Sequence, residues 1–183
     1  NLNMIKLVAF DMKVATFAAG CFWCTEAIFK RLKGVVSVTP GYTGGDLENP
    51  SYKKVSTGKT GHAEAIQIKF YPKVISFNKL LEIFWVIHDP TTLNQQGPDI
   101  GTQYRSAIFY HNEEQKKVAE DSKRKLKNSG LEGSKIVTEI KPFTKFFTAE
   151  EYHQNYYERN KDLNPYCSIV IDPKIQKLLD KFN

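Results

Sequence analysis

The chain has 183 residues, of which 41% are hydrophobic and 25% are charged, and its formal net charge is +6 at pH 7. This length suits one globular domain with a substantial core, and the apolar runs are too short to span a bilayer. We therefore expect a single domain over residues 1–183, with residues 1–12 as an N-terminal arm, rather than a transmembrane or low-complexity chain.

Two clusters of basic residues lie close together in the sequence. Basic clusters occur at residues 116–117 and 123–125, inside the stretch 112–128, which has few apolar positions. This pattern is typical of the solvated face of a surface helix. Because no RNA- or DNA-binding signature accompanies the charge, we expect no nucleic-acid partner.

The first half of the chain alternates between strand and helix patterns. Residues 13–19 predict a strand, and the helical spacing of apolar residues after Gly20 predicts a helix. Residues 35–38 predict a second short strand. A glycine-rich connection over 41–61 has a length that is usually functional, and the strict alternation of 66–70 then predicts a half-buried strand.

The second half begins with a clear helical pattern over 77–87. A polar loop over 91–103 leads to a short apolar strand at 106–110. Residues 112–128 predict a helix that ends near Gly130, and residues 136–140 alternate as a further strand.

The C-terminal third has weaker signals. Thr148 followed by Glu151 is a capping-box pattern, so we expect a helix over 149–160. A short terminal helix is expected at 173–181, with proline at its first position. The rest of 161–183 is expected to be an irregular, mobile tail.

The order of elements over residues 13–110 is strand, helix, strand, strand, helix, strand. This order is that of the split βαβ, or ferredoxin-like, arrangement. We therefore predict an α+β fold: a two-layer α/β sandwich with a ferredoxin-like core, an extra helix and strand, and an irregular C-terminal segment.

Cys21 stands where the first strand turns into the first helix. A cysteine at a helix N-terminus meets unpaired N–H groups and the positive end of the dipole, which favour the thiolate. Phe22 and Trp23 follow it, which suggests an apolar pocket beside the thiol. The alternative is that Cys21 packs as a small hydrophobe, as many free cysteines do.

The chain contains three cysteines, Cys21, Cys24 and Cys167. An odd number favours catalytic or redox thiols over a structural disulfide framework. Near the start we find no signal-peptide pattern, so we expect a reducing, cytoplasmic location.

Several blocks of the sequence resemble the methionine sulfoxide reductase A family, which reduces the S epimer of methionine sulfoxide. They occur in the order and spacing of that family and together span about residues 13–160. The blocks are Gly20-Cys21-Phe22-Trp23-Cys24-Thr25-Glu26, Gly41-Tyr42-Thr43-Gly44-Gly45, Asn49-Pro50-Ser51-Tyr52, Thr60-Gly61-His62-Ala63-Glu64, His88-Asp89-Pro90-Thr91-Thr92 and Asp99-Ile100-Gly101-Thr102-Gln103-Tyr104-Arg105-Ser106.

The resemblance implies a catalytic role for five residues. Cys21 would attack the sulfoxide sulfur, and Glu64 would protonate the departing oxygen, which needs a general acid. A carboxyl group can donate a proton at pH 7 only if burial raises its pKa. Tyr52 and Tyr104 match hydroxyl groups that hydrogen-bond the sulfoxide oxygen, and Asp99 matches an aspartate that positions the substrate.

The resemblance also implies binding and structural roles. Phe22 and Trp23 match an aromatic pocket for the terminal methyl group of the substrate. His62 and His88 lie in matching blocks, and we expect them to make structural hydrogen bonds.

Recycling of the enzyme requires a second thiol. The sulfenic acid on Cys21 would condense with a cysteine to a disulfide, which thioredoxin or another dithiol would reopen. Cys24 lies in a Cys-x-x-Cys pair with Cys21, and Cys167 lies in the C-terminal tail, so either residue or both in relay could resolve. We expect no bound cofactor, and a monomer that acts on methionine sulfoxide in peptides and oxidised proteins.

Two other functions remain open at this point. A thioredoxin-like disulfide oxidoreductase would use Cys21 and Cys24, although the long polar loops and the order of elements do not favour it. A zinc or nucleic-acid module would combine these cysteines with a histidine, but zinc sites usually offer a second close pair of ligands.

Overall fold

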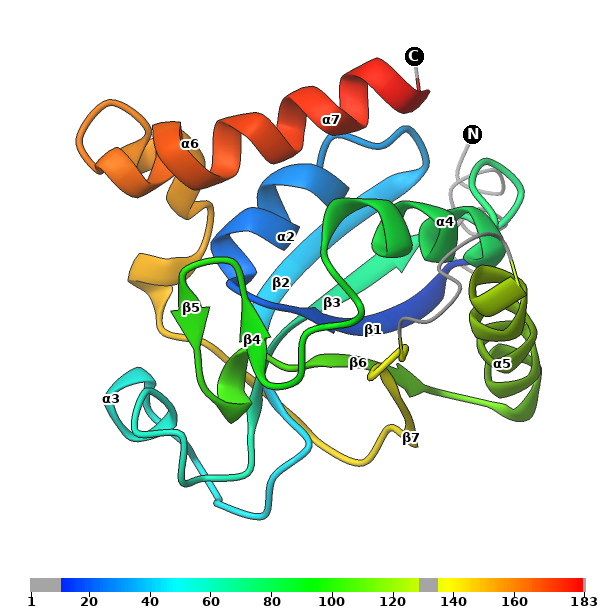
Figure 1. Cartoon of the computed structure of the whole chain (residues 1–183), viewed down its shortest axis with the longest axis horizontal. Coiled ribbons are helices and arrows are strands. Elements are labelled where there is room, and N and C mark those ends of the chain that lie inside the picture. The colour runs from blue at the N-terminus through cyan, green and yellow to red at the C-terminus, as the bar shows by residue number, and fades with distance from the viewer. Residues whose placement is uncertain (1–10, 129–134, 183) are drawn as a thin grey trace, which may run out of the picture.

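The structure is a computed structural model that describes residues 11–128 and 135–182. Most of the expected N-terminal arm and the expected helix end at Gly130 therefore lie outside the described residues. Within them the chain forms a six-stranded sheet of order β7-β6-β1-β3-β2-β8 (Figure 1). Its strands are β1 Lys13–Ala19, β2 Val35–Thr43, β3 Ala63–Phe70, β6 Ser106–Tyr110, β7 Glu139–Pro142 and β8 Phe146–Thr148.

The four central strands pair antiparallel, and only β7 joins the sheet parallel to its neighbour β6. The β3 strand shows why they form a half-buried sheet. Ile66, Ile68 and Phe70 are buried, whereas Lys69 is exposed and Gln67 is half-buried. The alternation predicted from the sequence is thus the alternation of the two faces.

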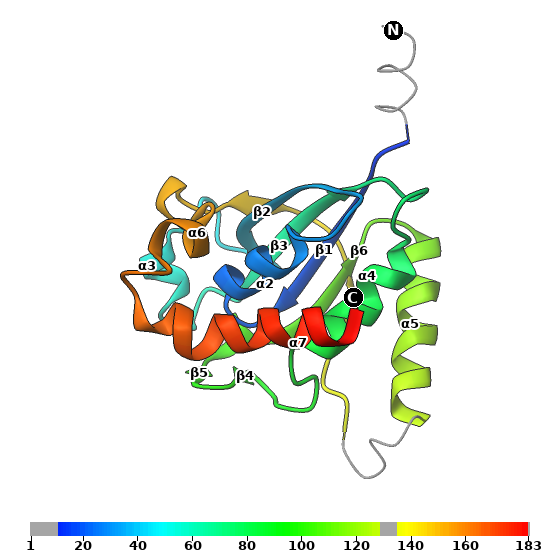
Figure 2. The ribbon, with the colours of Figure 1, turned by 90° about the horizontal axis from the view of Figure 1, so that it is seen from above.

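Helices cover one face of the sheet. They are α2 Phe22–Phe29, α4 Phe77–Ile87 and α5 Glu113–Asn128, and α7 Asp172–Phe182 lies across the outer side of α2 and α4 (Figure 2). The α4 helix begins at Ser76, whose hydroxyl accepts a hydrogen bond from the Lys79 N–H at 3.0 Å. The chain therefore has a mixed α/β fold.

The opposite face of the sheet is covered by loops rather than helices. Its buried residues are small: Ala18, Ala63, Ala65 and Ala107, together with Phe109. Phe143 and Phe146 pack against this cluster. Small side chains there let the loop before β8 approach the strands closely.

The long connection expected over 41–61 is partly ordered structure. The β2 strand continues through it to Thr43, and the short helix α3, Tyr52–Val55, starts after the cap residue Ser51. Further along, the expected loop over 91–103 contains a two-stranded hairpin, β4 Gln95–Gln96 and β5 Asp99–Ile100, and the 3₁₀ turn η1, Thr102–Tyr104. These insertions lie at the end of the sheet where β1 meets α2 (Figure 1).

The helix expected over 149–160 is wrong. Thr148 belongs to β8 and pairs with Gly41, so it does not cap a helix. The chain instead makes the 3₁₀ turn η2, Glu151–His153, and the short helix α6, Tyr156–Asn160. Asn155 separates them with φ +56°, a left-handed conformation that interrupts an α-helix.

The expectation of an irregular C-terminal segment is also wrong for residues 167–171, whereas the short terminal helix expected at 173–181 is confirmed as part of α7. Cys167–Ile171 forms the π-helical turn η3, which continues directly into α7. Ile171, Ile175 and Leu178 are buried on one side of this segment. Their burial against the α2 and α4 layer explains why a sequence rich in lysine and aspartate is helical here. Among the described residues no helix is long and apolar enough to cross a membrane.

Candidate active site

Cys21 lies in the tight turn between β1 and α2, as predicted. Gly20 has φ +86°, and a Cβ atom added to it would lie 2.7 Å from Cγ of Gln96, so glycine is required for both reasons. The Cys21 carbonyl accepts hydrogen bonds from the N–H groups of Cys24 and Thr25 at 3.1 and 3.4 Å. The turn therefore places Cys21 at the N-cap of α2, with its side chain only 6% exposed.

Burial opposes the thiolate that the helix N-terminus favours. It raises the pKa of Cys21 well above its usual range, and the hydrogen bond with the Cys24 side chain and the charge of Glu64 act in the same direction. The hydrogen bond from Cys21 lowers the pKa of Cys24, and the positive charge of Lys174 on α7 contributes. The fold therefore shifts the pKa values of the two thiols in opposite directions.

Glu64 is a buried acid beside this turn. It comes from β3, is 2% exposed, and its Oε1 accepts a hydrogen bond from the Phe22 N–H at 3.1 Å. Burial raises the pKa of Glu64 to about 8, although the Phe22 hydrogen bond lowers it in part. Negative charge on Asp99 and Cys24 adds to the increase. Glu64 is thus largely protonated at pH 7 and has a proton to donate.

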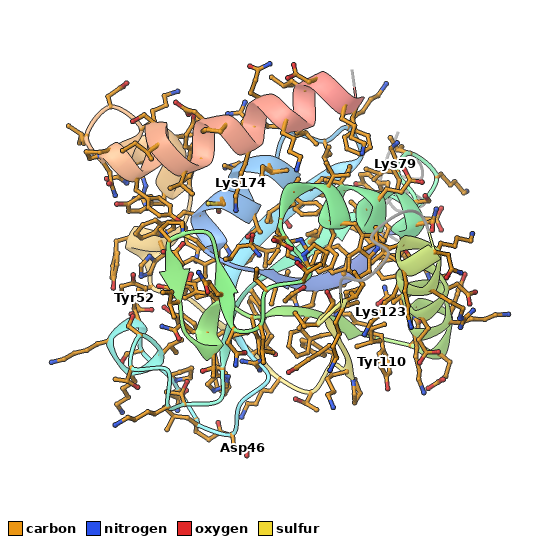
Figure 3. All side chains as sticks on the ribbon, viewed as in Figure 1. Asp46, Tyr52, Lys79, Tyr110, Lys123 and Lys174 are labelled. Atoms are coloured by element: carbon orange, nitrogen blue, oxygen red, sulfur yellow. The ribbon has the colours of Figure 1, made fainter. Side chains whose placement is uncertain are left out.

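Two tyrosines lie close enough to Glu64 to be affected by its charge. Tyr52 is the first residue of α3, and Tyr104 ends the turn η1. Burial raises the pKa of Tyr52 to about 12 and also raises that of Tyr104, with the charge of Glu64 as the second cause for both. Both hydroxyl groups therefore keep their protons at neutral pH. Figure 3 labels Tyr52 to the left of the β4–β5 hairpin and Lys174 above it.

Glu150 holds Tyr52 in place. Its Oε2 accepts a hydrogen bond from the Tyr52 N–H at 2.9 Å, and its Oε1 accepts one from the Tyr42 hydroxyl at 2.8 Å. These two bonds join α3 and β2 to the segment that follows β8. Tyr42 itself is fully buried, so the anchor lies under the site rather than at its rim.

The two aromatic residues after Cys21 differ in exposure. Phe22 is fully buried and packs against the rings of Tyr42 and His153, at centroid distances of 5.7 and 5.0 Å. Trp23 is half-buried and stacks on Tyr156, with a centroid distance of 3.8 Å and an interplanar angle of 6°. Together the rings form an apolar wall next to the thiols.

His153 fixes the Trp23 indole. The Trp23 Nε1–H donates to Nδ1 of His153 at 3.0 Å, and since an indole nitrogen cannot accept, Nδ1 of the histidine must be unprotonated. His153 is therefore neutral with its proton on Nε2, an atom that has no hydrogen-bond partner among the described residues. Burial lowers the pKa of His153 and so preserves this state.

Asp99 on β5 is hydrogen-bonded to the C-terminal segment. Its Oδ2 accepts a hydrogen bond from the Tyr166 hydroxyl at 2.5 Å, and the same hydroxyl lies 3.8 Å from Sγ of Cys24. Tyr166 also meets Trp23 edge to face at 5.8 Å. The C-terminal segment thus closes over the thiol pair and reaches the β4–β5 hairpin.

Cys167 is buried directly behind Tyr166 and is not the mobile thiol that the sequence suggested. Its side chain is 0% exposed, and burial raises its pKa, with the charges of Asp172 and Cys24 contributing. Cys21, Cys24 and Cys167 are all free thiols.

The histidines in the sequence motifs make structural hydrogen bonds, as expected. His62 accepts from the Gly45 N–H at 3.1 Å and donates to the Leu47 carbonyl at 2.8 Å. His88 donates from Nδ1 to the Phe84 carbonyl and bonds the Ser106 hydroxyl through Nε2 at 2.7 Å. In the part of the chain that the structure describes, no three His, Cys, Asp or Glu side chains are grouped so as to hold a metal ion.

Sequence reasoning missed four residues of the site: Glu150, His153, Tyr156 and Tyr166. The first three fell in a segment interpreted as one continuous helix, and Tyr166 fell in the expected C-terminal tail. Glu26 of α2 is also buried and accepts a hydrogen bond from the Asn155 N–H at 3.1 Å. The density of aromatic residues between 152 and 166 is the one signal that could have indicated a buried role.

Comparison with known proteins agrees with this arrangement. The family model described as peptide methionine sulfoxide reductase matches residues 13–183. The peptide methionine sulfoxide reductase MsrA of Saccharolobus solfataricus is 56% identical over 171 residues, which cover 93% of this chain and 95% of that protein.

Two solved structures add a comparison of folds. The reduced form of Mxr1 from Saccharomyces cerevisiae is 39% identical, with a TM-score of 0.79 over 85% of this chain and 89% of that one. Mxr1 in complex with Trx2 is 30% identical, with a TM-score of 0.58 over 80% of this chain and 86% of that one.

Proposed function

Because the chain belongs to the peptide methionine sulfoxide reductase family, we propose that its thiol site reduces the S epimer of methionine sulfoxide, free or in proteins, to methionine. The observation that carries this proposal is the buried Glu64 carboxyl, which hydrogen-bonds the Phe22 N–H beside Cys21. A sulfoxide oxygen needs a proton before it can leave, and an acid with a pKa near 8 holds one at neutral pH. The enzyme thereby repairs oxidised methionine.

The proposed reaction uses five side chains. Cys21 attacks the sulfoxide sulfur, and Glu64 donates a proton to the oxygen and regains one from the Cys21 thiol. The hydroxyl groups of Tyr52 and Tyr104 donate hydrogen bonds to that oxygen. Methionine leaves when the oxygen passes to Cys21 as a sulfenic acid. Asp99 orients the substrate. The raised pKa values of the two tyrosines support their role as donors, because both stay protonated.

The methyl group of the substrate would lie against the aromatic wall. Phe22 and Trp23 supply its apolar surface, and the stacking of Trp23 on Tyr156 keeps the indole from turning away. A pocket of this kind selects an apolar group by exclusion of water rather than by a directed bond. The hydrogen bond to His153 fixes the remaining rotation of the indole.

Two thiols are available to reduce the sulfenic acid. Cys24 contacts Cys21, and its lowered pKa suits the attacking thiol of a condensation that releases water. Cys167 would then exchange with the Cys21–Cys24 disulfide and present a Cys24–Cys167 bond to the reductant. The solved complex of the related Mxr1 with Trx2 supports thioredoxin or a similar dithiol as that reductant, with no bound cofactor.

The proposal also includes the topology of the core, the oligomeric state and the cellular compartment of the enzyme. The strand order β6-β1-β3-β2 with antiparallel pairing supports a ferredoxin-like core for the four central strands. A single domain that works as a monomer in a reducing, cytoplasm-like compartment fits a reaction that consumes dithiol. A thioredoxin-like disulfide oxidoreductase is not favoured, since the peptide methionine sulfoxide reductase model matches residues 13–183 and the MsrA relative is 56% identical.

The test is turnover of a peptide that contains racemic methionine sulfoxide, with excess dithiothreitol and with each epimer followed separately. We expect the native protein to consume only the S epimer and Cys21→Ser to consume neither. Cys167→Ser is the matched control, because it removes a buried thiol that the first chemical step does not use. If folded, reduced native protein consumes neither epimer, the proposal is wrong.

A further inference from the structure

Tyr166 lies where it can control the accessibility of the Cys167 thiol. Its hydroxyl donates to Oδ2 of Asp99 at 2.5 Å and lies 3.8 Å from Sγ of Cys24, and the next residue along the chain is Cys167. The three groups come from the C-terminal segment, the β4–β5 hairpin and α2. One phenol therefore fastens the Cys167 segment to both sides of the thiol site.

From this geometry we propose that Tyr166 is a positioning residue, a latch that keeps Cys167 buried while Cys24 is a free thiol and releases it once Cys24 has entered a disulfide. The proposal rests on the reductase function proposed above. It adds to that function an order of events, in which Cys167 becomes accessible only after Cys21 has been oxidised and resolved.

The hydrogen-bonding capacity of a phenol explains the coupling. A tyrosine hydroxyl has one proton, and here the proton is directed to the Asp99 carboxylate. The contact with Cys24 therefore depends on the S–H group, which donates to the phenol oxygen. When Cys24 condenses with the Cys21 sulfenic acid, one S–S bond forms, water leaves and that S–H group is lost. Tyr166 then keeps only its bond to Asp99.

The position of Cys167 makes such a release necessary. Its side chain is 0% exposed, its N–H donates to the Asn164 carbonyl at 3.0 Å, and it begins the π-helical turn η3. A π-helical turn is rare and often marks a functional position. Once free, the Cys167 thiolate attacks Sγ of Cys24, and Cys21 leaves as a thiolate, so the catalytic thiol is restored without any further oxidant.

The first experiment measures the alkylation rate of Cys167 in the reduced protein by mass mapping with iodoacetamide. Tyr166→Phe removes the hydroxyl and keeps the ring. We expect about a tenfold faster rate than in the native protein, the change produced by a loss of about 1.4 kcal/mol. Tyr157→Phe is the matched control, because Tyr157 bonds Asp172 in the same C-terminal region but does not touch the thiols. Equal rates in native and Tyr166→Phe proteins, or equal acceleration in both variants, overturn the latch.

The second experiment follows the order of events after one turnover. Reduced protein is mixed with methionine sulfoxide without reductant, quenched in acid at intervals and mapped for disulfides. In the native protein the Cys24–Cys167 bond should appear after a lag behind methionine, and Tyr166→Phe should shorten that lag. An unchanged lag contradicts the latch. Absence of methionine contradicts the proposed function instead, and the alkylation rates still test the latch because they require no turnover.

Discussion

The Glu64 carboxyl accepts a hydrogen bond from the backbone N–H of Phe22 at 3.1 Å. This bond joins the start of β3 to the first turn of α2, and the two bonded residues are 42 positions apart in the sequence. It aims the acid at the helix N-terminus that Cys21 caps. An N–H donor stabilises the carboxylate, yet burial outweighs it and the pKa of Glu64 stays near 8. The acid is therefore both oriented and protonated.

Glu64→Gln should lower turnover by about 10²–10⁴-fold, the usual range for loss of a general acid. The amide keeps the size of the side chain but has no proton to give, so folding should be preserved. In the native protein, turnover should fall as the pH rises through about 8, where Glu64 loses its proton. Steady-state rates between pH 6 and pH 9 check this. A variant with the native rate, or one that keeps the native pH profile, removes Glu64 from the mechanism.

The raised pKa of Glu64 should also make the stability of the protein depend on pH. The pKa of Glu64 is 4.5 before and about 8 after folding, so between these values the folded protein holds a proton that the unfolded chain has lost. The free energy of unfolding should then decrease as the pH rises from about 4.5 to about 8, with a slope of at most about 1.4 kcal/mol for each pH unit. Urea unfolding of native protein and Glu64→Gln checks this, since the variant should lack that part of the slope. Parallel curves would contradict it.

Gly20→Ala should destabilise the fold by about 2–4 kcal/mol. Its φ of +86° costs an L-residue roughly 1–2 kcal/mol, and a Cβ atom would overlap with Gln96. Gly97→Ala is the matched control, with φ +55° but nothing within 4 Å of the added atom, and should cost only about 1 kcal/mol. Urea unfolding measures both. Equal costs would show that the close approach of β4 to the Cys21 turn is not needed.

Local sequence patterns correctly predicted the elements that bury one face along their whole length. The alternation of 66–70 and the helical spacing of 77–87 agree with β3 and α4, because one face of each element is buried along its whole length. The helix expected over 149–160 failed because Thr148 is held in the sheet by Gly41, a partner more than a hundred residues away. Long-range pairing of this kind has no local signal.

The residues of the site also divide into those that local motifs indicate and those that only the folded chain brings together. Cys21, Glu64 and Tyr52 could be assigned from motifs, whereas His153 and Tyr166 acquire roles only through contacts made in the folded chain. The pKa of Cys21 is the clearest case. A helix N-terminus lowers the pKa of a cysteine, but the depth of burial, which raises it here, is a property of the complete fold.

His153→Phe should raise KM for the sulfoxide peptide and cost about 1–3 kcal/mol of stability, because the Trp23 N–H loses its acceptor and stays partly buried. His153→Asn is the control, since an amide oxygen can replace Nδ1 as the acceptor, and it should restore most of the loss in KM. Denaturant unfolding and Michaelis curves measure both effects. Two variants with the same KM would show that the indole needs no fixed orientation.

Cys24 and Cys167 should have different roles in the reduction of the Cys21 sulfenic acid. Cys24→Ser should leave the first release of methionine intact but slow thioredoxin-driven turnover by about 100-fold or more, because Cys24 is the thiol in contact with Cys21 and its pKa is lowered. Cys167→Ser should retain dithiothreitol-driven turnover and lose only the thioredoxin-driven rate, since a small dithiol can reach a bond that a protein reductant cannot. Quenched-flow methionine release and coupled thioredoxin oxidation measure the two steps separately. If Cys24→Ser recycles with thioredoxin at the native rate while Cys167→Ser does not, Cys167 resolves the sulfenic acid directly and the relay through Cys24 is wrong.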